Sequence, residues 1–311
     1  MGDKVEYFQL DSGRYSYYVS IRTKFNTITR KEHSYTINVG GKMKGCIEIT
    51  VERPSVQDTS VDERYAELES TKNVAYISWI GYSPKCSIDG NLISGVGTRH
   101  MIRAALTIVC NRFDWITQFS LDDASTVKCV EKITVNLAFL SIALNGKTYY
   151  EKYLNAYLEE PLNQKYKAGL DLIKSLQKKP FQTFIEEFQI HNKEIKDYIR
   201  DPYESTITFQ EFFTSLNTKC KTDTKHFCAI TQNWLEPLIN YLLANRRNQF
   251  FMAKWFIDKE SIKSIAIDLW ENVYDHSVLK NIREAFQEEF KQNGGSVKTP
   301  SSYFGNYEDN L

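Results

Sequence analysis

The spacing of the apolar residues changes near Pro161, and this change constrains the fold more than any other feature of the chain. Before it, short runs alternate apolar and polar residues, which is typical of β-strands with one buried face. After it, apolar residues recur every three or four positions over long stretches, which is typical of amphipathic helices. The pattern predicts an α+β fold: a mixed central sheet with flanking helices over 1–160, then an all-α region over 161–292. The Ser-, Asn- and Gly-rich segment 293–311 is predicted to be a disordered tail.

The local patterns predict the order of the elements. Residues 1–14 are polar and predict a loose start, and 54–71 predict a loop with a short helix over 63–68. The run 74–82 is apolar almost throughout, which favours a central strand buried on both faces. A glycine pair at 40–41 predicts a hairpin between two strands. Strands are predicted over 15–23, 33–39, 43–52, 74–82 and 117–122, and a helix is predicted over 98–112.

Charge, hydropathy and cysteine usage restrict the class of protein. Lys and Arg together number 39, as do Asp and Glu, so the formal net charge is zero. A broad nucleic-acid-binding surface is therefore not expected, because it would need an excess of basic residues. No run approaches the ~20 apolar residues of a membrane-spanning helix, and the polar start of the sequence predicts no signal peptide. The six scattered cysteines predict reduced thiols and a cytoplasmic or nuclear location.

A Gly-x-Gly turn stands between the strand over 74–82 and the helix over 98–112. A helix N-terminus exposes unpaired N–H groups and the positive end of the helix dipole, and glycine lets the backbone approach a ligand closely. Arg99 and Arg103 lie one helical turn apart and add positive charge there. The motif favours a phosphate-binding loop, with a purely structural turn as the alternative. His100 occupies the position of the third glycine of a dinucleotide fingerprint, so a Rossmann site is disfavoured, and a neutral His100 is expected.

The order of strand, Gly-x-Gly turn, helix, strand and tyrosine-containing helix resembles the GNAT family of acetyl-CoA-dependent N-acetyltransferases. The sequence Tyr150-Glu151-Lys152 in the segment 147–153 adds to the resemblance. The resemblance implies a GNAT-like sheet over 1–160, with acetyl-CoA bound against the strand 74–82. It also implies that Tyr150 is the general acid for the leaving thiolate, with Tyr149 as the neighbouring alternative. The cofactor-binding residues that it implies are Ile80, Tyr82, Gly95, Val96, Gly97, Thr98, Arg99 and Arg103.

The chain departs from the family pattern at three places, one of which is a longer loop between the strand 74–82 and the helix 98–112. Leu92 stands where the family usually has Gln or Arg, and Asn155 stands one residue beyond the position of an expected glycine. We therefore predict a non-catalytic, degenerate GNAT-like protein that acts through protein–protein interaction or self-association of its helical region. An acetyl-CoA-dependent N-acetyltransferase is the alternative, for which Glu48 and Glu52 are the candidate general bases.

Two further expectations concern metals and the source of the chain. Cys220, His226 and Cys228 are too sparse for a structural zinc site, and no metal is expected. The glycine turn together with the Asn145–Lys152 segment is also similar to proteins of large nucleo-cytoplasmic DNA viruses. That similarity implies a location in the host cytoplasm or the viral factory.

Overall fold

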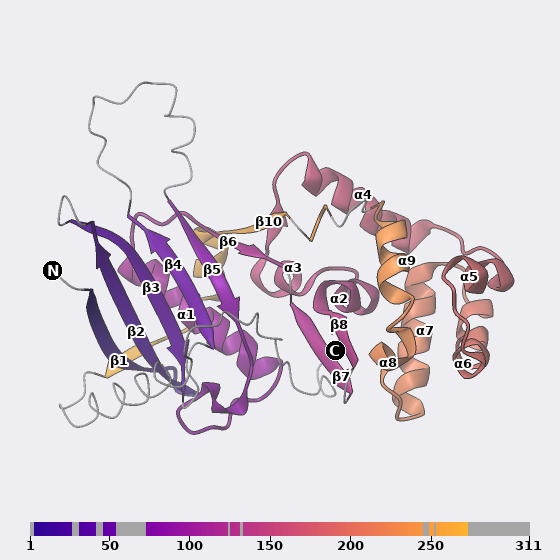
Figure 1. The fold of residues 1–311 in the computed structure, drawn as a ribbon, viewed down its shortest axis with the longest axis horizontal. Helices are drawn as coiled ribbons and strands as arrows, with labels where there is room; N and C mark the ends of the chain where they lie inside the picture. Colours follow the sequence, from indigo (N-terminus) through magenta and orange to yellow (C-terminus); the bar gives the residue numbers. More distant parts are fainter. Residues whose placement is uncertain are drawn as a thin grey trace. The chain divides into compact units, whose positions relative to one another are not determined.

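The computed structural model describes residues 3–26, 31–41, 46–53, 73–123, 125–130, 133–244, 249–251 and 253–272. The predicted helix 63–68 and the predicted tail 293–311 lie outside these ranges. The chain forms two compact units, each with segments from two parts of the sequence (Figure 1). The first comprises Met1–Leu121 and Phe256–Phe304, and the second comprises Asp122–Trp255 and Gly305–Leu311. The boundary expected at 160 falls inside the second unit.

A mixed sheet forms most of the first unit, and its strand β9 belongs to the second unit. Its hydrogen-bonded order is β11-β1-β2-β3-β4-β5-β6-β10-β9, and the boundary between the units falls within β10. The pairs from β11 through β5 are antiparallel, whereas β5 and β6 are parallel. The strands are β1 (Lys4–Asp11), β2 (Ser16–Phe25), β3 (Glu32–Gly40), β4 (Ile47–Glu52), β5 (Val74–Ile80), β6 (Gln118–Asp122), β9 (Tyr157–Leu158), β10 (Lys254–Asp258) and β11 (Trp270–Asn272).

The sheet confirms the α+β class and corrects two predictions. β10 and β11 come from the part of the chain after 161, so the prediction that this part is all-α is wrong. β1 pairs with β2 from Lys4↔Thr23 to Asp11↔Ser16, so the prediction of a loose start is also wrong. The turn between these two strands contains Gly13 with φ of 73°, a backbone conformation that favours glycine.

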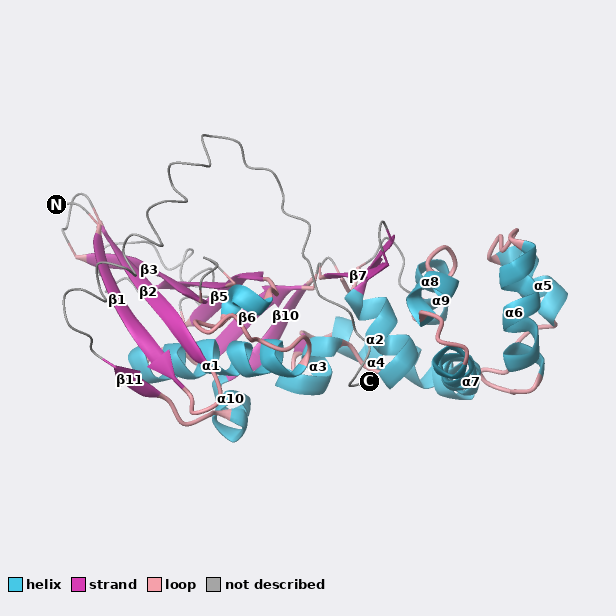
Figure 2. Cartoon of the chain, turned by 90° about the horizontal axis from the view of Figure 1, so that it is seen from below, coloured by secondary structure: helices cyan, strands magenta, loops and turns pink. Residues whose placement is uncertain are grey.

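One face of the sheet is buried against α1 (Val96–Arg112), which lies along it (Figure 2). Alternate residues of β2 and β3 are buried, as a period of two requires. The helix buries the positions that its apolar spacing indicates, including Ile102, Leu106 and Val109. β5 is central, as predicted, but its residues alternate in burial, so the prediction of burial on both faces is wrong. The 3-10 turn η2 (Pro84–Cys86) and α10 (Lys259–Ile265) complete the described part of this unit.

Helices dominate the second unit. They are α2 (Leu137–Asn145), α3 (Tyr149–Leu154), α4 (Leu162–Ser175), α5 (Phe181–Glu187), α6 (Lys193–Glu204), α7 (Phe209–Thr222), α8 (Phe227–Thr231) and α9 (Leu235–Leu242). β7 (Thr126–Val130) and β8 (Ile133–Asn136) form a separate antiparallel pair. The predicted capping box is present at the start of α7, where Thr208 and Glu211 each accept a main-chain N–H of the other.

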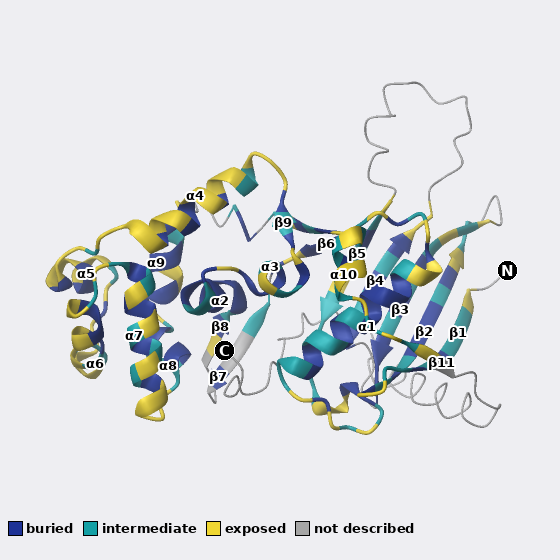
Figure 3. Cartoon of the chain, turned by 180° about the vertical axis from the view of Figure 1, so that it is seen from behind, coloured by how far each residue is buried: buried dark blue, intermediate teal, exposed yellow. Residues whose placement is uncertain are grey.

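Four aromatic rings form the centre of the α5–α9 region. Phe184 stacks on Tyr203 with ring centroids 4.5 Å apart, and Phe212 stacks on Trp234 at 5.9 Å. The two stacks meet edge to face, at 5.7 Å between Phe184 and Trp234 and 5.1 Å between Tyr203 and Phe212. Such pairs contribute about 0.5–1.5 kcal/mol each beyond area burial. The helices therefore turn aromatic faces inward and polar faces outward (Figure 3).

Two disulfides correct the expectation of reduced thiols. Cys46 is bonded to Cys86 in the first unit, and Cys129 is bonded to Cys228 in the second. Cys110 and Cys220 are free. The prediction is therefore wrong for four of the six cysteines, because distant segments bring them together in pairs.

None of the helices in the described part of the chain has the length and apolar character that crossing a bilayer requires. The same ranges contain no group of three or more His, Cys, Asp or Glu side chains suited to a metal ion.

Candidate functional site

The C-terminal end of β5 is irregular in a way that isolates its last residues from β6. The parallel pairing ends at Ile77↔Leu121, while β5 continues to Ile80 along β4. A register shift in the β4–β5 pairing makes Ser78 an extra residue, and its hydroxyl donates to the Glu48 carboxylate at 2.8 Å. Bulges of this kind often redirect a strand next to a functional site. The carboxylate of Glu48, a candidate general base, therefore accepts a hydrogen bond from the serine at the bulge.

The turn before α1 is held against the end of β5. The Tyr82 hydroxyl donates to the Leu92 carbonyl at 3.0 Å, and the Ser94 N–H also approaches this hydroxyl. Gly95 has φ of 71° and no atom within 4 Å of the place where a Cβ would stand. The first glycine is therefore required by backbone conformation.

Gly97 is required for a different reason, the packing of an apolar side chain. A Cβ added there would lie 2.8 Å from Cγ of Leu92, which is only 2 % exposed. Leu92 is the residue that departs from the GNAT pattern. The second glycine thus makes room for this leucine, which fills space beside the first turn of the helix.

The first turn of α1 also consumes its own N–H groups. Two of the N–H groups that a helix start leaves free donate to carbonyls of the preceding turn, Val96 to Ser94 and Gly97 to Ile93, and Arg99 makes the first regular helical bond to Gly95. Thr98 is the fourth residue of the turn, and it is 1 % exposed. A phosphate-binding loop needs these amides open to a ligand. The amides of Val96 and Gly97 are therefore engaged within the turn, and acetyl-CoA binding at this turn remains a prediction.

The predicted cofactor-binding residues all lie in the first unit. Ile80 ends β5, and Tyr82 follows it. Arg99 and Arg103 lie on α1, and both are partly exposed. The resemblance implied that one end of β5 and the start of α1 lie together, and they do. The sequence did not indicate that the Leu92 side chain would fill the space beside Gly97.

Tyr150 lies in the second unit and is 3 % exposed. It belongs to α3, whose N-cap residue Thr148 accepts the N–H of Glu151 with its hydroxyl. Its hydroxyl is 2.8 Å from the Ser125 hydroxyl. The neighbouring candidate, Tyr149, contacts it edge to face at 5.5 Å between ring centroids. The role of Tyr150 as a general acid remains a prediction, and Ser125 is the partner that sequence reasoning did not identify.

A buried carboxyl group follows β6 directly. Asp123 is 1 % exposed, and neither of its oxygens accepts a hydrogen bond of normal geometry. Burial raises its pKa to about 7, and the nearby Ser125 N–H lowers it only in part. Burial and the Glu151 carboxylate, which accepts from the Tyr166 hydroxyl at 2.8 Å, raise the pKa of Tyr166, and Asp123 adds a smaller effect. The burial of Asp123 could not be predicted from the sequence.

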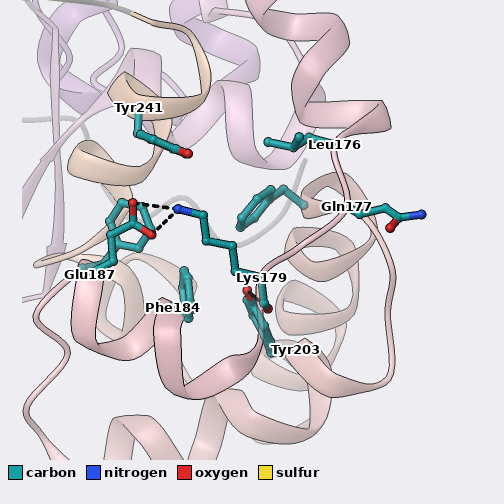
Figure 4. A pocket seen from close by; sticks show the side chains of 9 residues that line it. Leu176, Gln177, Lys179, Phe184, Glu187, Tyr203 and Tyr241 are labelled. Carbon is teal, nitrogen blue, oxygen red and sulfur yellow. Dashed lines mark hydrogen bonds and ion pairs between the residues drawn. The ribbon is translucent and has the colours of Figure 1, made fainter.

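The helical unit has an apolar pocket of about 80 Å³ (Figure 4). At its rim, the Lys179 ammonium forms an ion pair with Glu187 at 2.8 Å and lies 5.1 Å from the centre of the Tyr241 ring. Tyr241 is 49 % exposed and Leu176 is 37 % exposed. The residues that line the pocket are Leu176, Gln177, Lys179, Phe184, Glu187, Phe188, Tyr203, Phe209 and Tyr241.

Phe250, Phe251 and Trp255 are buried in the core, whereas Tyr241 is exposed at the pocket. In the sequence, Tyr241 is distinguished only by its position off the apolar face that Leu238, Ile239 and Leu242 form on α9.

The chain matches no protein-family model, no curated protein and no solved structure in comparisons with known proteins.

Proposed function

We propose that the chain is a non-catalytic binding protein on a GNAT-like scaffold, and that its helical unit binds a partner protein through the pocket beside Tyr241. The observation that carries the proposal is the closed first turn of α1. Leu92 fills the space beside Gly97, and the N–H groups of Val96 and Gly97 donate to carbonyls of the preceding turn. A protein that held acetyl-CoA there would need that turn open.

The scaffold part of the proposal has topological support. A helix joins the parallel pair β5 and β6, so the start of α1 and the carboxyl end of β5 meet at one edge of the sheet. Ligands of sheets with parallel strands commonly bind at such an edge. The bulge at Ser78 and the glycine turn lie at the same edge. This arrangement is what the GNAT resemblance implied. A shared scaffold does not imply a shared activity, so it is compatible with a non-catalytic protein.

The binding part rests on the size and composition of the pocket. A volume of about 80 Å³ suits one apolar side chain, whereas small-molecule sites usually have several hundred Å³. The floor is aromatic, and the rim carries an ion pair and an exposed tyrosine. Buried aromatic anchors within a polar rim are typical of protein interfaces. The pocket therefore favours an apolar side chain of a partner protein as the occupant.

The binding proposal is tested by substitution at the rim. Affinity capture from the cell type in which the protein is found is compared for the wild type, Tyr241→Ala and Ile207→Ala. Ile207 is the matched control, since it is 65 % exposed in the same unit but does not line the pocket. A partner captured in this way is then purified and titrated calorimetrically. The expected result is an affinity loss of about 30-fold for Tyr241→Ala and little change for Ile207→Ala.

Equal affinities of Tyr241→Ala and Ile207→Ala for the partner would show that this pocket is not the binding site. Sedimentation of the purified chain tests self-association by the same surface, which Tyr241→Ala should abolish if a second copy is the partner.

An acetyl-CoA-dependent N-acetyltransferase is the second candidate function. The hydroxyl pair of Tyr150 and Ser125 favours it, because two hydroxyls in contact can relay a proton. A ligand that binds only the folded state raises its stability, so millimolar acetyl-CoA should raise the Tm if this function holds. Tyr150→Phe should then lower kcat with little effect on KM. An unchanged Tm at millimolar acetyl-CoA would exclude the enzyme and leave the binding proposal standing.

A further inference from the structure

Three basic side chains gather on the first unit where the β1–β2 turn meets α1. They are Arg14 of the turn and His100 and Arg103 of the helix, and we refer to them as the Arg–His cluster. Burial lowers the pKa of His100, and the nearby charges of Arg14 and Arg103 lower it further. Arg14 and Arg103 come from segments almost ninety positions apart. The fold therefore concentrates positive charge at one point of a chain whose net charge is zero.

Two tyrosines hold the cluster in place. The Tyr17 hydroxyl is 2.9 Å from Nδ1 of His100, and the Tyr15 ring contacts the His100 ring edge to face, with centroids 5.3 Å apart. The donor of this hydrogen bond depends on the tautomer of His100. Where Nδ1 accepts from Tyr17, the ring proton of neutral His100 lies on Nε2 and is a further donor. The Arg14 guanidinium lies 5.4 Å from the centre of the Tyr15 ring.

The polar groups of this region are short of acceptors. In the part of the chain that the structure describes, no carboxylate lies within ion-pair distance of Arg14 or Arg103. Nε of Arg103 is buried without a hydrogen-bond partner, as are the hydroxyls of Tyr15 and Thr98. Tyr15 is 5 % exposed, and its hydroxyl lies 3.4 Å from the place where a Cβ of Gly97 would stand. Buried polar groups in native proteins are usually paired, so this concentration of donors indicates a missing acceptor.

We propose that the Arg–His cluster is a binding site for a phosphate-type dianion. Phosphate offers oxygen acceptors to several donors at once, and guanidinium groups match its geometry. The donors here are side chains: Arg103 is shared with the residues that the GNAT resemblance implies, whereas Arg14 of the β1–β2 turn and His100 are not among them. It is also independent of the partner-binding pocket, which lies in the second unit.

His100 provides a direct readout of the proposed site. A dianion beside it offsets the charges of Arg14 and Arg103 and therefore raises its pKa. The chain has five histidines, so NMR resolves the titration of His100 against the other four as internal references. Inorganic phosphate is the probe, and acetate at matched ionic strength is the monoanion control. We expect a saturable rise of the His100 pKa with phosphate and a much weaker effect with acetate.

Substitutions separate a site from general electrostatics. Arg14→Ala should raise the Kd for phosphate by about tenfold, the value of one charged hydrogen bond. Arg14 is exposed, so this variant should fold normally. Arg112→Ala is the matched control, because Arg112 lies at the other end of the same helix and pairs with Glu6 at 3.7 Å. The Kd of this control should stay within about twofold of the wild-type value.

Three results would overturn the proposal. One is a His100 pKa that does not change with phosphate, and another is an equal response to acetate. The third is an equal effect of Arg14→Ala and Arg112→Ala on the Kd, which would indicate general attraction to a basic helix. A well-dispersed NMR spectrum of each variant verifies that its fold is intact.

Discussion

Asp123 should make the stability of the protein fall as the pH rises from acid to neutral. Burial raises the pKa of this carboxyl group from 3.8 to about 7. The folded state therefore holds a proton that the unfolded state releases. Its stabilising contribution is complete below the unfolded pKa and is lost as the pH rises through the folded pKa. The shift spans about three pH units, and each unit corresponds to about 1.4 kcal/mol, so the loss between about pH 4 and pH 7 is about 4 kcal/mol.

Asp123→Asn isolates this effect, because the amide has nearly the same shape and does not titrate. The free energy of unfolding is measured in urea across this pH range, with the fluorescence of buried Trp234 and Trp255 as the signal. The stability of the variant relative to the wild type should increase by about 4 kcal/mol between about pH 4 and pH 7, and then level off. Any cost of burying the amide does not depend on pH, so it shifts the whole curve without changing its shape.

The neighbouring Asp122→Asn variant is the control, since Asp122 is exposed at the end of β6. Its stability relative to the wild type should show a much smaller pH dependence. If the stability difference between Asp123→Asn and the wild type were constant across the range, burial of a protonated Asp123 would be refuted.

Three further predictions follow from local contacts. Gly97→Ala should destabilise the fold by about 1–3 kcal/mol through the contact with Leu92, and adding Leu92→Ala should recover part of the lost Tm; no recovery would contradict the packing argument. Replacing both Cys46 and Cys86 with Ser should lower the free energy of unfolding by about 2–4 kcal/mol in urea, and a non-reducing peptide map that lacks the linked peptides would disprove the bridge. Lys178 should react with acetic anhydride faster than most lysines, since burial lowers its pKa to about 8; mass spectrometry should find it among the first acetylated sites, and late labelling would argue against it.

The comparison of sequence and structure separates local patterns from long-range pairing. α1 was predictable because its apolar residues recur at helical spacing, and β2 to β4 were predictable because theirs alternate. β10 was not predictable, because the aromatic segment around Trp255 fits the period of a helix as well as that of a strand. Only a place beside β6 in the sheet makes that segment a strand.

The candidate sites show the same division. The glycine turn before α1 was visible in the sequence, since two glycines between a strand and a helix indicate a special backbone. The sequence did not show that Leu92 packs into the space beside Gly97, because the two side chains meet only in three dimensions. The Tyr150–Ser125 contact joins residues 25 positions apart and was equally hidden.

The sequence by itself determined which segments form strands, which segments form helices and where glycine interrupts them, because these features depend on residues a few positions apart. The tertiary structure alone decided which cysteines pair, which carboxyl group loses water and which basic side chains converge. Arg14 illustrates the reason: it lies far from His100 in the sequence, and only the packing of α1 on the sheet brings its charge near that ring. Desolvation and charge depend on distances in space, and the chain sets those distances only when it folds.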